Sequence, residues 1–115
     1  MDNEDWKKLM LTLKSLMAVH KPIYVIDDNT ERRFDYPPDM QYWMINEFSE
    51  LWHRIGLRKY CQILPKDMIG KLTSMQIQEL ALKEFEITFQ IGLFEDMIEA
   101  FTWMKTNDEI GYERL

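Results

Sequence analysis

Two adjacent carboxylates, Asp27 and Asp28, follow a short apolar run and are the strongest chemical signal in the chain. Open α/β sheets bind ligands at the carboxyl ends of their strands, and with Asp35 this pair offers oxygen ligands for a weak cation site. A phosphoaccepting receiver domain would also need a Ser or Thr and a Lys at later strand ends, where Leu64-Pro65 and Ile91-Gly92 stand instead. We therefore interpret the acidic residues as a solvated turn that caps local backbone, with a ligand or cation site as the alternative.

The remaining residues with catalytic or metal-binding potential are scattered. Cys61 is the only cysteine, which excludes an internal disulfide and a Cys-based zinc site, and its apolar surroundings predict a buried thiol. His20 and His53 belong to different predicted helices and have no Cys or carboxylate at ligand spacing. No serine lies in a glycine elbow, and the four glycines are too dispersed for a phosphate loop. We expect no enzymatic activity and no cofactor.

Large side chains are more numerous than a small core needs. The chain has nine methionines and four tryptophans, and most of them fall on predicted helical stripes, where packing is the ordinary role. A domain of this size cannot bury every large aromatic ring, and exposed ones mark interfaces. The candidate interface residues are Tyr42, Trp43, Trp52 and Trp103.

Size and charge narrow the class of protein. The chain has 115 residues, 46% of them hydrophobic, which suits a single domain over residues 1–105 with a polar tail over 106–115. Its net charge of -6 repels phosphate, and the basic residues form only two short groups, so we expect no nucleic-acid partner. The acidic N-terminus is unlike a signal peptide and no apolar run reaches membrane-spanning length. We expect a cytoplasmic protein without membrane insertion.

Hydrophobic periodicity predicts four helices separated by three short strands. Pro22 ends the first helix, Gly56 ends the second, and Thr73 with Gln76 forms a capping box for the third. The segment 66–72 before that box has room for one helical turn. The predicted order is helix 4–19, strand 23–26, helix 37–56, strand 60–64, helix 73–84, strand 86–91 and a last helix following Gly92.

Apolar stripes mark the predicted inward faces of the helices, and the second helix carries one made of Met40, Trp43, Met44, Phe48, Leu51, Trp52 and Ile55. The first helix carries an apolar stripe of Trp6, Leu9, Met10, Leu13, Leu16 and Met17. The last carries Phe94, Met97, Ile98, Phe101 and Met104, with Glu95-Asp96 in its first turn. The run 23–26 is apolar at every position, which favours a strand covered on both faces. The run 86–91 alternates, which favours an edge strand.

Strands that alternate with helices predict an α/β fold with a mainly parallel sheet. Three strands flanked by four helices make a small sheet, and its edges need cover. Either an extra edge strand, supplied by the tail or by the segment at Arg32-Arg33-Phe34, or a second copy of the chain completes it.

The order of the elements and several short sequence segments resemble STAS-like domains. These domains are relatives of the anti-sigma factor antagonists and of lipid-binding domains grouped with them. The resemblance covers roughly residues 6–105. It rests on a strand that ends in Asp27, on Phe34-Asp35-Tyr36-Pro37-Pro38-Asp39, on 56–60 and 63–67, and on the closing patterns 85–87, 94–96 and 99–104. It implies a non-catalytic regulatory module.

Two departures limit what the resemblance implies. The turn Asp35-Tyr36-Pro37-Pro38 lacks the phosphoacceptor serine of the antagonists, and the strands that usually open such domains are missing before the first helix. We therefore expect a protein-interaction or regulatory module that self-associates as a homodimer or binds a protein partner. The alternative is a small-ligand or lipid-binding domain with a pocket between the Met- and Trp-rich helices and the sheet.

Overall fold

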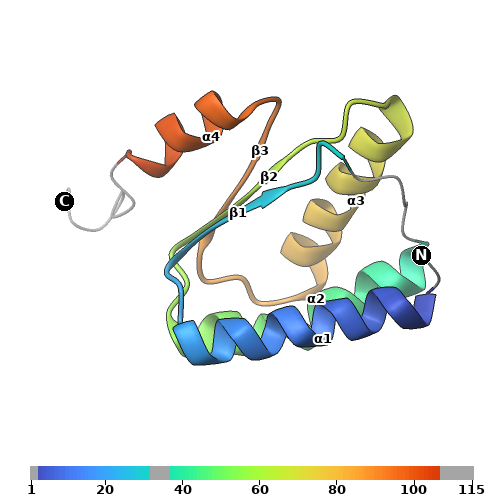
Figure 1. Cartoon of the computed structure of the whole chain (residues 1–115), viewed down its shortest axis with the longest axis vertical. Helices are drawn as coiled ribbons and strands as arrows, with labels where there is room; N and C mark the ends of the chain where they lie inside the picture. The colour runs from blue at the N-terminus through green and yellow to red at the C-terminus, as the bar shows by residue number, and fades with distance from the viewer. Residues whose placement is uncertain (1–2, 32–36, 107–115) are drawn as a thin grey trace.

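Helices and strands alternate along the whole described chain. The computed structural model describes residues 3–31 and 37–106. Within them the fold is α/β, as predicted (Figure 1). The elements are α1 (Asn3–His20), β1 (Tyr24–Asp28), α2 (Pro38–Ile55), β2 (Lys59–Ile63), α3 (Met68–Glu84), β3 (Gln90–Phe94) and α4 (Met97–Met104).

The three strands form one all-parallel sheet in the order β1-β2-β3. Tyr24 is in register with Lys59, and Lys59 with Gln90. Successive side chains of a strand point to opposite faces of the sheet. Val25 and Tyr60 therefore lie on one face, which we call the Tyr60 face, and Ile26 and Cys61 lie on the other. β3 (Gln90–Phe94) is one edge strand of this sheet, although it lies further along the chain than the alternating run 86–91 for which an edge was predicted. β1 is the other edge strand and is not buried on both faces, which corrects the expectation for 23–26.

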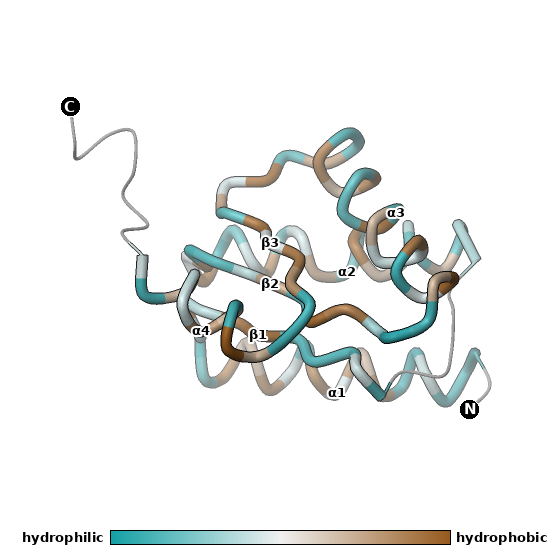
Figure 2. The backbone as a smooth tube through the Cα atoms, turned by 90° about the horizontal axis from the view of Figure 1, so that it is seen from above, coloured by the Kyte–Doolittle hydropathy of each residue, from teal (hydrophilic) through white to brown (hydrophobic). Residues whose placement is uncertain are grey.

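The helices cover the two faces unequally (Figures 1 and 2). On the Tyr60 face, α1 and α2 enclose the largest core cluster, with Met17, Phe48 and Trp52 at its centre. Ile45 of α2 meets α3 in a second cluster. On the opposite face only α4 packs, through Ala100 against Cys61 and Ile63. In Figure 2, α1 lies beside β1 and α3 lies toward the other edge of the sheet.

Helix ends follow local chemistry. Gly56 ends α2 in the left-handed conformation, with φ 74°, as predicted. The predicted capping box at Thr73 is wrong, because α3 begins earlier and runs unbroken through it. Asp67 is the N-cap and accepts a hydrogen bond from the Gly70 amide at 2.8 Å, while the Thr73 hydroxyl donates to the Ile69 carbonyl within the helix. One helix therefore replaces the predicted turn and helix.

The last strand lies further along the chain than the alternation of 86–91 predicts. Its ladder starts where the Gln90 amide donates to the Arg58 carbonyl at 3.0 Å. Phe89, just before it, packs against Trp52 in the core instead of pairing. Phe94 closes the strand rather than opening a helix, and α4 follows from the N-cap Asp96.

Two predicted inward stripes are only partly buried. α4 rests on β2 and β3 through Ala100, Trp103 and Met104, so Ile98 is 78% exposed and Met97 and Phe101 also reach solvent. α1 buries Trp6 and Met17, whereas Leu9, Leu13 and Leu16 are exposed. A short helix on a three-stranded sheet covers too little area to bury a full stripe, and α1 has one neighbouring helix only.

Candidate functional site

The acidic pair at the end of β1 is held by local hydrogen bonds. The Tyr60 hydroxyl donates to Asp27 Oδ2 at 2.7 Å from the neighbouring strand. Asp28 Oδ1 accepts from the Thr30 amide at 3.0 Å and from its hydroxyl at 2.8 Å, which lowers the pKa of the Asp28 carboxyl. Both carboxylates thus take part in local structure, as the capping interpretation predicts for Asp28.

The alternative of a cation site is not assembled in the described part of the chain. Asp35 lies outside the described residues. Among residues 3–31 and 37–106, no three His, Cys, Asp or Glu side chains are placed to share a metal ion. Asp27 instead stands at one end of an apolar groove.

That groove, of about 200 Å³, runs between α1, α2 and β1. Its walls are mainly apolar, with Leu13 and Met17 from α1, Phe48 and Trp52 from α2, and Val25 from the strand. The polar part of the lining is Asp28 together with Asp27 and Tyr60, which are joined by their hydrogen bond. The groove therefore combines side chains of α1, α2, β1 and β2.

The four candidate interface aromatics have different positions. Tyr42 is the exposed one and stacks on Phe85, with ring centroids 5.1 Å apart. Trp43 is half-buried against Trp6, and Trp103 is half-buried against Phe94.

Trp52, the fourth candidate, is a core residue. It is only 7% exposed and packs against Phe48, Tyr60 and Phe89. The four rings therefore form no common patch, and Trp52 presents no ring to solvent.

Cys61 is buried, whereas His20 and His53 lie on the exposed surface of α1 and α2. Cys61 is fully buried, and burial together with the negative charge of Asp27 raises the pKa of its thiol to about 11. Such a thiol is protonated at neutral pH and is a poor nucleophile. His53 Nδ1 lies 3.3 Å from the Thr88 hydroxyl on the exposed surface, and His20 ends α1.

Lys59 is the buried charge that the sequence interpretation missed. Arg54, Arg58 and Lys59 make up one of the two short basic groups of the sequence, yet the Lys59 side chain is fully buried. Its ammonium donates to the carbonyls of Trp103 and Thr106, both at 2.8 Å. Its position directly before the apolar run 60–64 is the one sequence signal of this role, because Lys59 becomes the first residue of the central strand.

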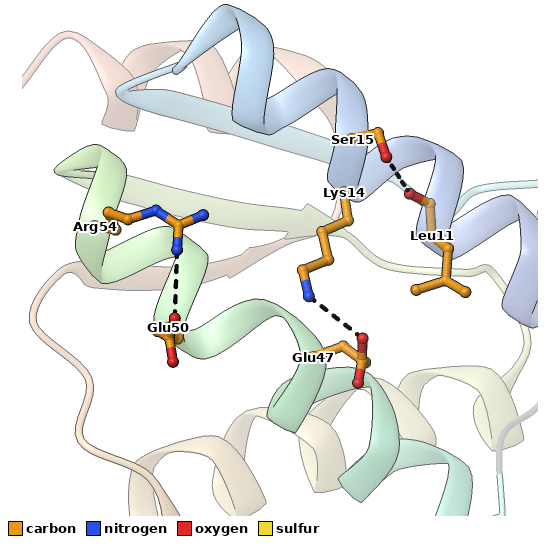
Figure 3. Close-up of polar contacts among 6 residues, drawn as sticks. All are labelled: Leu11, Lys14, Ser15, Glu47, Glu50 and Arg54. Atoms are coloured by element: carbon orange, nitrogen blue, oxygen red, sulfur yellow. Dashed lines mark hydrogen bonds and ion pairs between the residues drawn. The ribbon is translucent and has the colours of Figure 1, made fainter.

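One flank of α1, beside the groove, carries exposed leucines. Lys14 reaches across to Glu47 of α2 at 3.3 Å and marks the flank that faces α2 (Figure 3). At 100° per residue, Leu9 and Leu16 fall on the opposite flank of the helix. They are 50% and 52% exposed. We call this flank, the groove and the outer edge of β1 together the α1–β1 side.

Comparison with protein-family models, with curated proteins and with solved structures finds no match to this chain. Within the described residues, no helix has both the length and the apolar character needed to cross a membrane. The site must therefore be interpreted from its own geometry.

Proposed function

We propose that this protein is a non-catalytic interaction module that forms a homodimer through its α1–β1 side. The single observation that carries the proposal is the juxtaposition of an open strand edge with an exposed leucine flank. β1 pairs only with β2 among the described strands, and Leu9 and Leu16 project from the helix beside it. Unpaired strand edges and apolar patches each favour association.

The backbone of β1 shows which groups are available to a partner. The Ile23 carbonyl accepts from the amides of Arg58 and Lys59, and the Asn29 amide donates to the Ile63 carbonyl, so odd-numbered residues face β2. Strand residues alternate in the direction of their backbone groups. The amide and carbonyl of Ile26, between them, point away from the sheet toward the open edge.

A second copy fits this edge better in the antiparallel direction. With Ile26 at the two-fold axis, the two Ile26 residues exchange their amide and carbonyl groups, as opposed residues do in antiparallel pairs. Tyr24 of one copy then lies opposite Asp28 of the other, so a phenol meets a carboxylate at both ends. Antiparallel pairing keeps Asp27 and Asp28 of one copy away from those of the other, whereas parallel pairing would bring these like charges together.

The helices support the same symmetry. A two-fold axis through the β1 edge places both copies of α1 on the same face of a six-stranded sheet. Leu9, Leu13 and Leu16 follow the i, i+4, i+7 spacing of a helix-packing stripe. The groove between α1 and β1 offers about 200 Å³ for side chains of the partner.

The resemblance to STAS-like domains is part of this proposal. The parallel sheet with alternating helices is the coarse architecture that such domains have, and the pairing of two copies would extend the sheet beyond β1. Regulation would then act through binding rather than through phosphorylation of a serine, because the turn at 35–38 contains none.

Sedimentation velocity of the whole chain tests the proposal, with Leu16→Glu as the disrupting variant. Leu82→Glu is the matched control, since Leu82 on α3 is 57% exposed and lies outside the α1–β1 side. We expect wild type and Leu82→Glu to sediment as dimers and Leu16→Glu as a monomer. Self-association would be overturned if the wild type sedimented as a monomer, even if that monomer bound a different protein. It would also be overturned if the two variants sedimented identically.

A further inference from the structure

The groove between α1, α2 and β1 has a polar end and an aromatic end, and contacts within one chain join them. Tyr60 stands between the two ends, because its hydroxyl donates to Asp27 Oδ2 at 2.7 Å and its ring centroid lies 5.2 Å from that of Trp52. The ring of Trp52 in turn lies 5.3 Å from that of Phe48. All four residues line the groove. A carboxylate and three aromatic rings therefore follow one another along a single hollow.

Two observations place the Asp27 carboxylate on the face of the sheet that the groove occupies. Side chains alternate along β1, so Asp27 lies on the same face as Val25 and Tyr60, the face that α1 and α2 cover. The hydrogen bond from Tyr60 holds Oδ2 on that face. Within residues 3–31 and 37–106, Tyr60 is the one side-chain donor to Asp27. A carboxylate can accept several hydrogen bonds, so Asp27 has room for a further donor.

Acidic groups are the charged side chains among the described residues that line the groove. Asp27 is half-buried, and Asp28 borders the groove from an exposed position. Lys14, next to the lining residue Leu13, instead pairs with Glu47 at 3.3 Å (Figure 3). A charge in apolar surroundings is costly unless a group of opposite sign pairs with it. The groove therefore favours a cation over a neutral molecule and disfavours an anion.

The volume and the walls decide the rest of the ligand. The groove measures about 200 Å³, and an apolar cavity of about 150 Å³ is enough to hold benzene. One aromatic ring with a short arm therefore fits, whereas a drug-sized ligand needs a pocket of about 300 Å³ or more. Phe48, Trp52 and Met17 are buried and offer fixed apolar walls. Aromatic rings also attract cations through their faces.

We infer that the groove binds a small primary amine with a benzyl-sized apolar group, whose ammonium donates to Asp27 and whose ring packs against Phe48 and Trp52. A divalent metal ion is a poorer occupant, because it requires several oxygen ligands. No three His, Cys, Asp or Glu side chains of the described residues are placed to share one. The inference goes beyond the proposed homodimer and does not depend on it, since one chain supplies the whole lining.

Nuclear magnetic resonance of the full chain, labelled with nitrogen-15 and kept at low ionic strength, tests the site with benzylamine as the probe. Benzyl alcohol is the matched neutral molecule, since a hydroxyl replaces the ammonium, and benzoate is the anion. We expect benzylamine to shift the backbone amide signals of Asp27 and Tyr60 and the indole signal of Trp52 saturably. Benzyl alcohol should bind about tenfold more weakly, because it leaves the carboxylate charge unpaired. Benzoate should give no saturable shift.

Asp27→Asn keeps the shape of the side chain and removes its charge. It should lower the affinity for benzylamine by about tenfold, to that of the alcohol. Glu79→Gln is the matched control and should leave the affinity unchanged, because it removes an equal charge from the exposed face of α3, outside the groove. Leu16→Glu, the variant expected to be monomeric, leaves the lining intact and should still prefer the amine to the alcohol. This variant separates the ligand site from the proposed dimer.

Three results in the titrations would overturn the inference. They are the absence of a saturable benzylamine shift at the groove signals, equal binding of amine and alcohol by the wild type, and wild-type affinity for the amine in Asp27→Asn. Loss of the preference in Leu16→Glu would place the site between two chains and would also overturn it. The wild-type comparison of amine and alcohol decides the matter even if Asp27→Asn does not fold.

Discussion

The ammonium of Lys59 donates a hydrogen bond to the Trp103 carbonyl at 2.8 Å and thereby joins the central strand to the end of the last helix. The same ammonium reaches the carbonyl and the hydroxyl of Thr106 and lies 5.0 Å from the centre of the Trp103 ring. A positive charge at the C-terminus of a helix complements its dipole and its unpaired carbonyls. Lys59 is therefore the C-terminal cap that positions α4 on the sheet.

Lys59→Met should destabilise the protein, because it removes the donor to several carbonyls while keeping most of the buried side-chain volume. We expect a loss of about 1–3 kcal/mol in the free energy of unfolding, measured by urea denaturation, and faster hydrogen exchange in α4 than in α2. Lys83→Met, on the exposed face of α3, is the control and should change stability little. Equal effects of the two variants would contradict the capping role.

Cys61 should make the protein less stable at high pH. Its folded pKa of about 11 lies above the ordinary value of 9.0, so the folded state favours the neutral thiol. The stabilisation is fully present below pH 9 and is lost as the pH rises from 9 to 11, by an amount on the order of 2 kcal/mol. Denaturation curves across this window should fall more steeply for wild type than for Cys61→Ala. Parallel curves would show that Cys61 does not contribute.

The thiol should also be inert toward alkylation in the native state. Cys61 is fully buried and protonated at pH 8, so iodoacetamide should modify it slowly in buffer and rapidly in urea. Mass spectrometry of the quenched reaction follows the modification. Rapid native alkylation would mean that the strand opens or that the thiol is activated.

Gly56→Ala should cost about 1 kcal/mol of stability. A Cβ at this position meets nothing within 4 Å, so the cost comes from the positive φ alone and not from a clash. Gly56→Asn should recover part of the loss, since Asn tolerates the left-handed conformation better than Ala. Thermal unfolding of both variants measures the difference, and an Ala variant as stable as wild type would argue against the left-handed cap.

Asp67→Ala should cost about 1 kcal/mol, the usual effect of removing an N-cap side chain. Gln76→Ala should cost less, because Gln76 lies inside the helix and its bond to Gln41, at 3.3 Å, is its one side-chain contact with a neighbouring helix that the structure records. Chemical denaturation ranks the two variants. The reverse order would restore the capping box at Thr73 as the start of α3.

Sequence patterns alone predicted the order of the elements, the parallel sheet and the glycine that ends α2. These features depend on local signals, since proline and glycine restrict the backbone and apolar spacing distinguishes helices from strands. The buried Cys61 was predicted for the same reason, because it lies in the middle of an apolar run. The acidic end of β1 was also found in this way, whereas the hydrogen bond that Asp27 accepts from Tyr60 was not predicted.

Tertiary packing decided which candidates face the core and which face solvent. Ile98 and Leu16 belong to apolar stripes, yet they are exposed because no element within residues 3–31 and 37–106 covers their side of the helix. Lys59 is buried because the end of α4 supplies carbonyls for its ammonium. Asp27 and Trp52 come from different elements and line one groove only after the sheet has packed against α2. Sequence periodicity describes each element separately, whereas burial depends on the neighbours that the fold assembles around it.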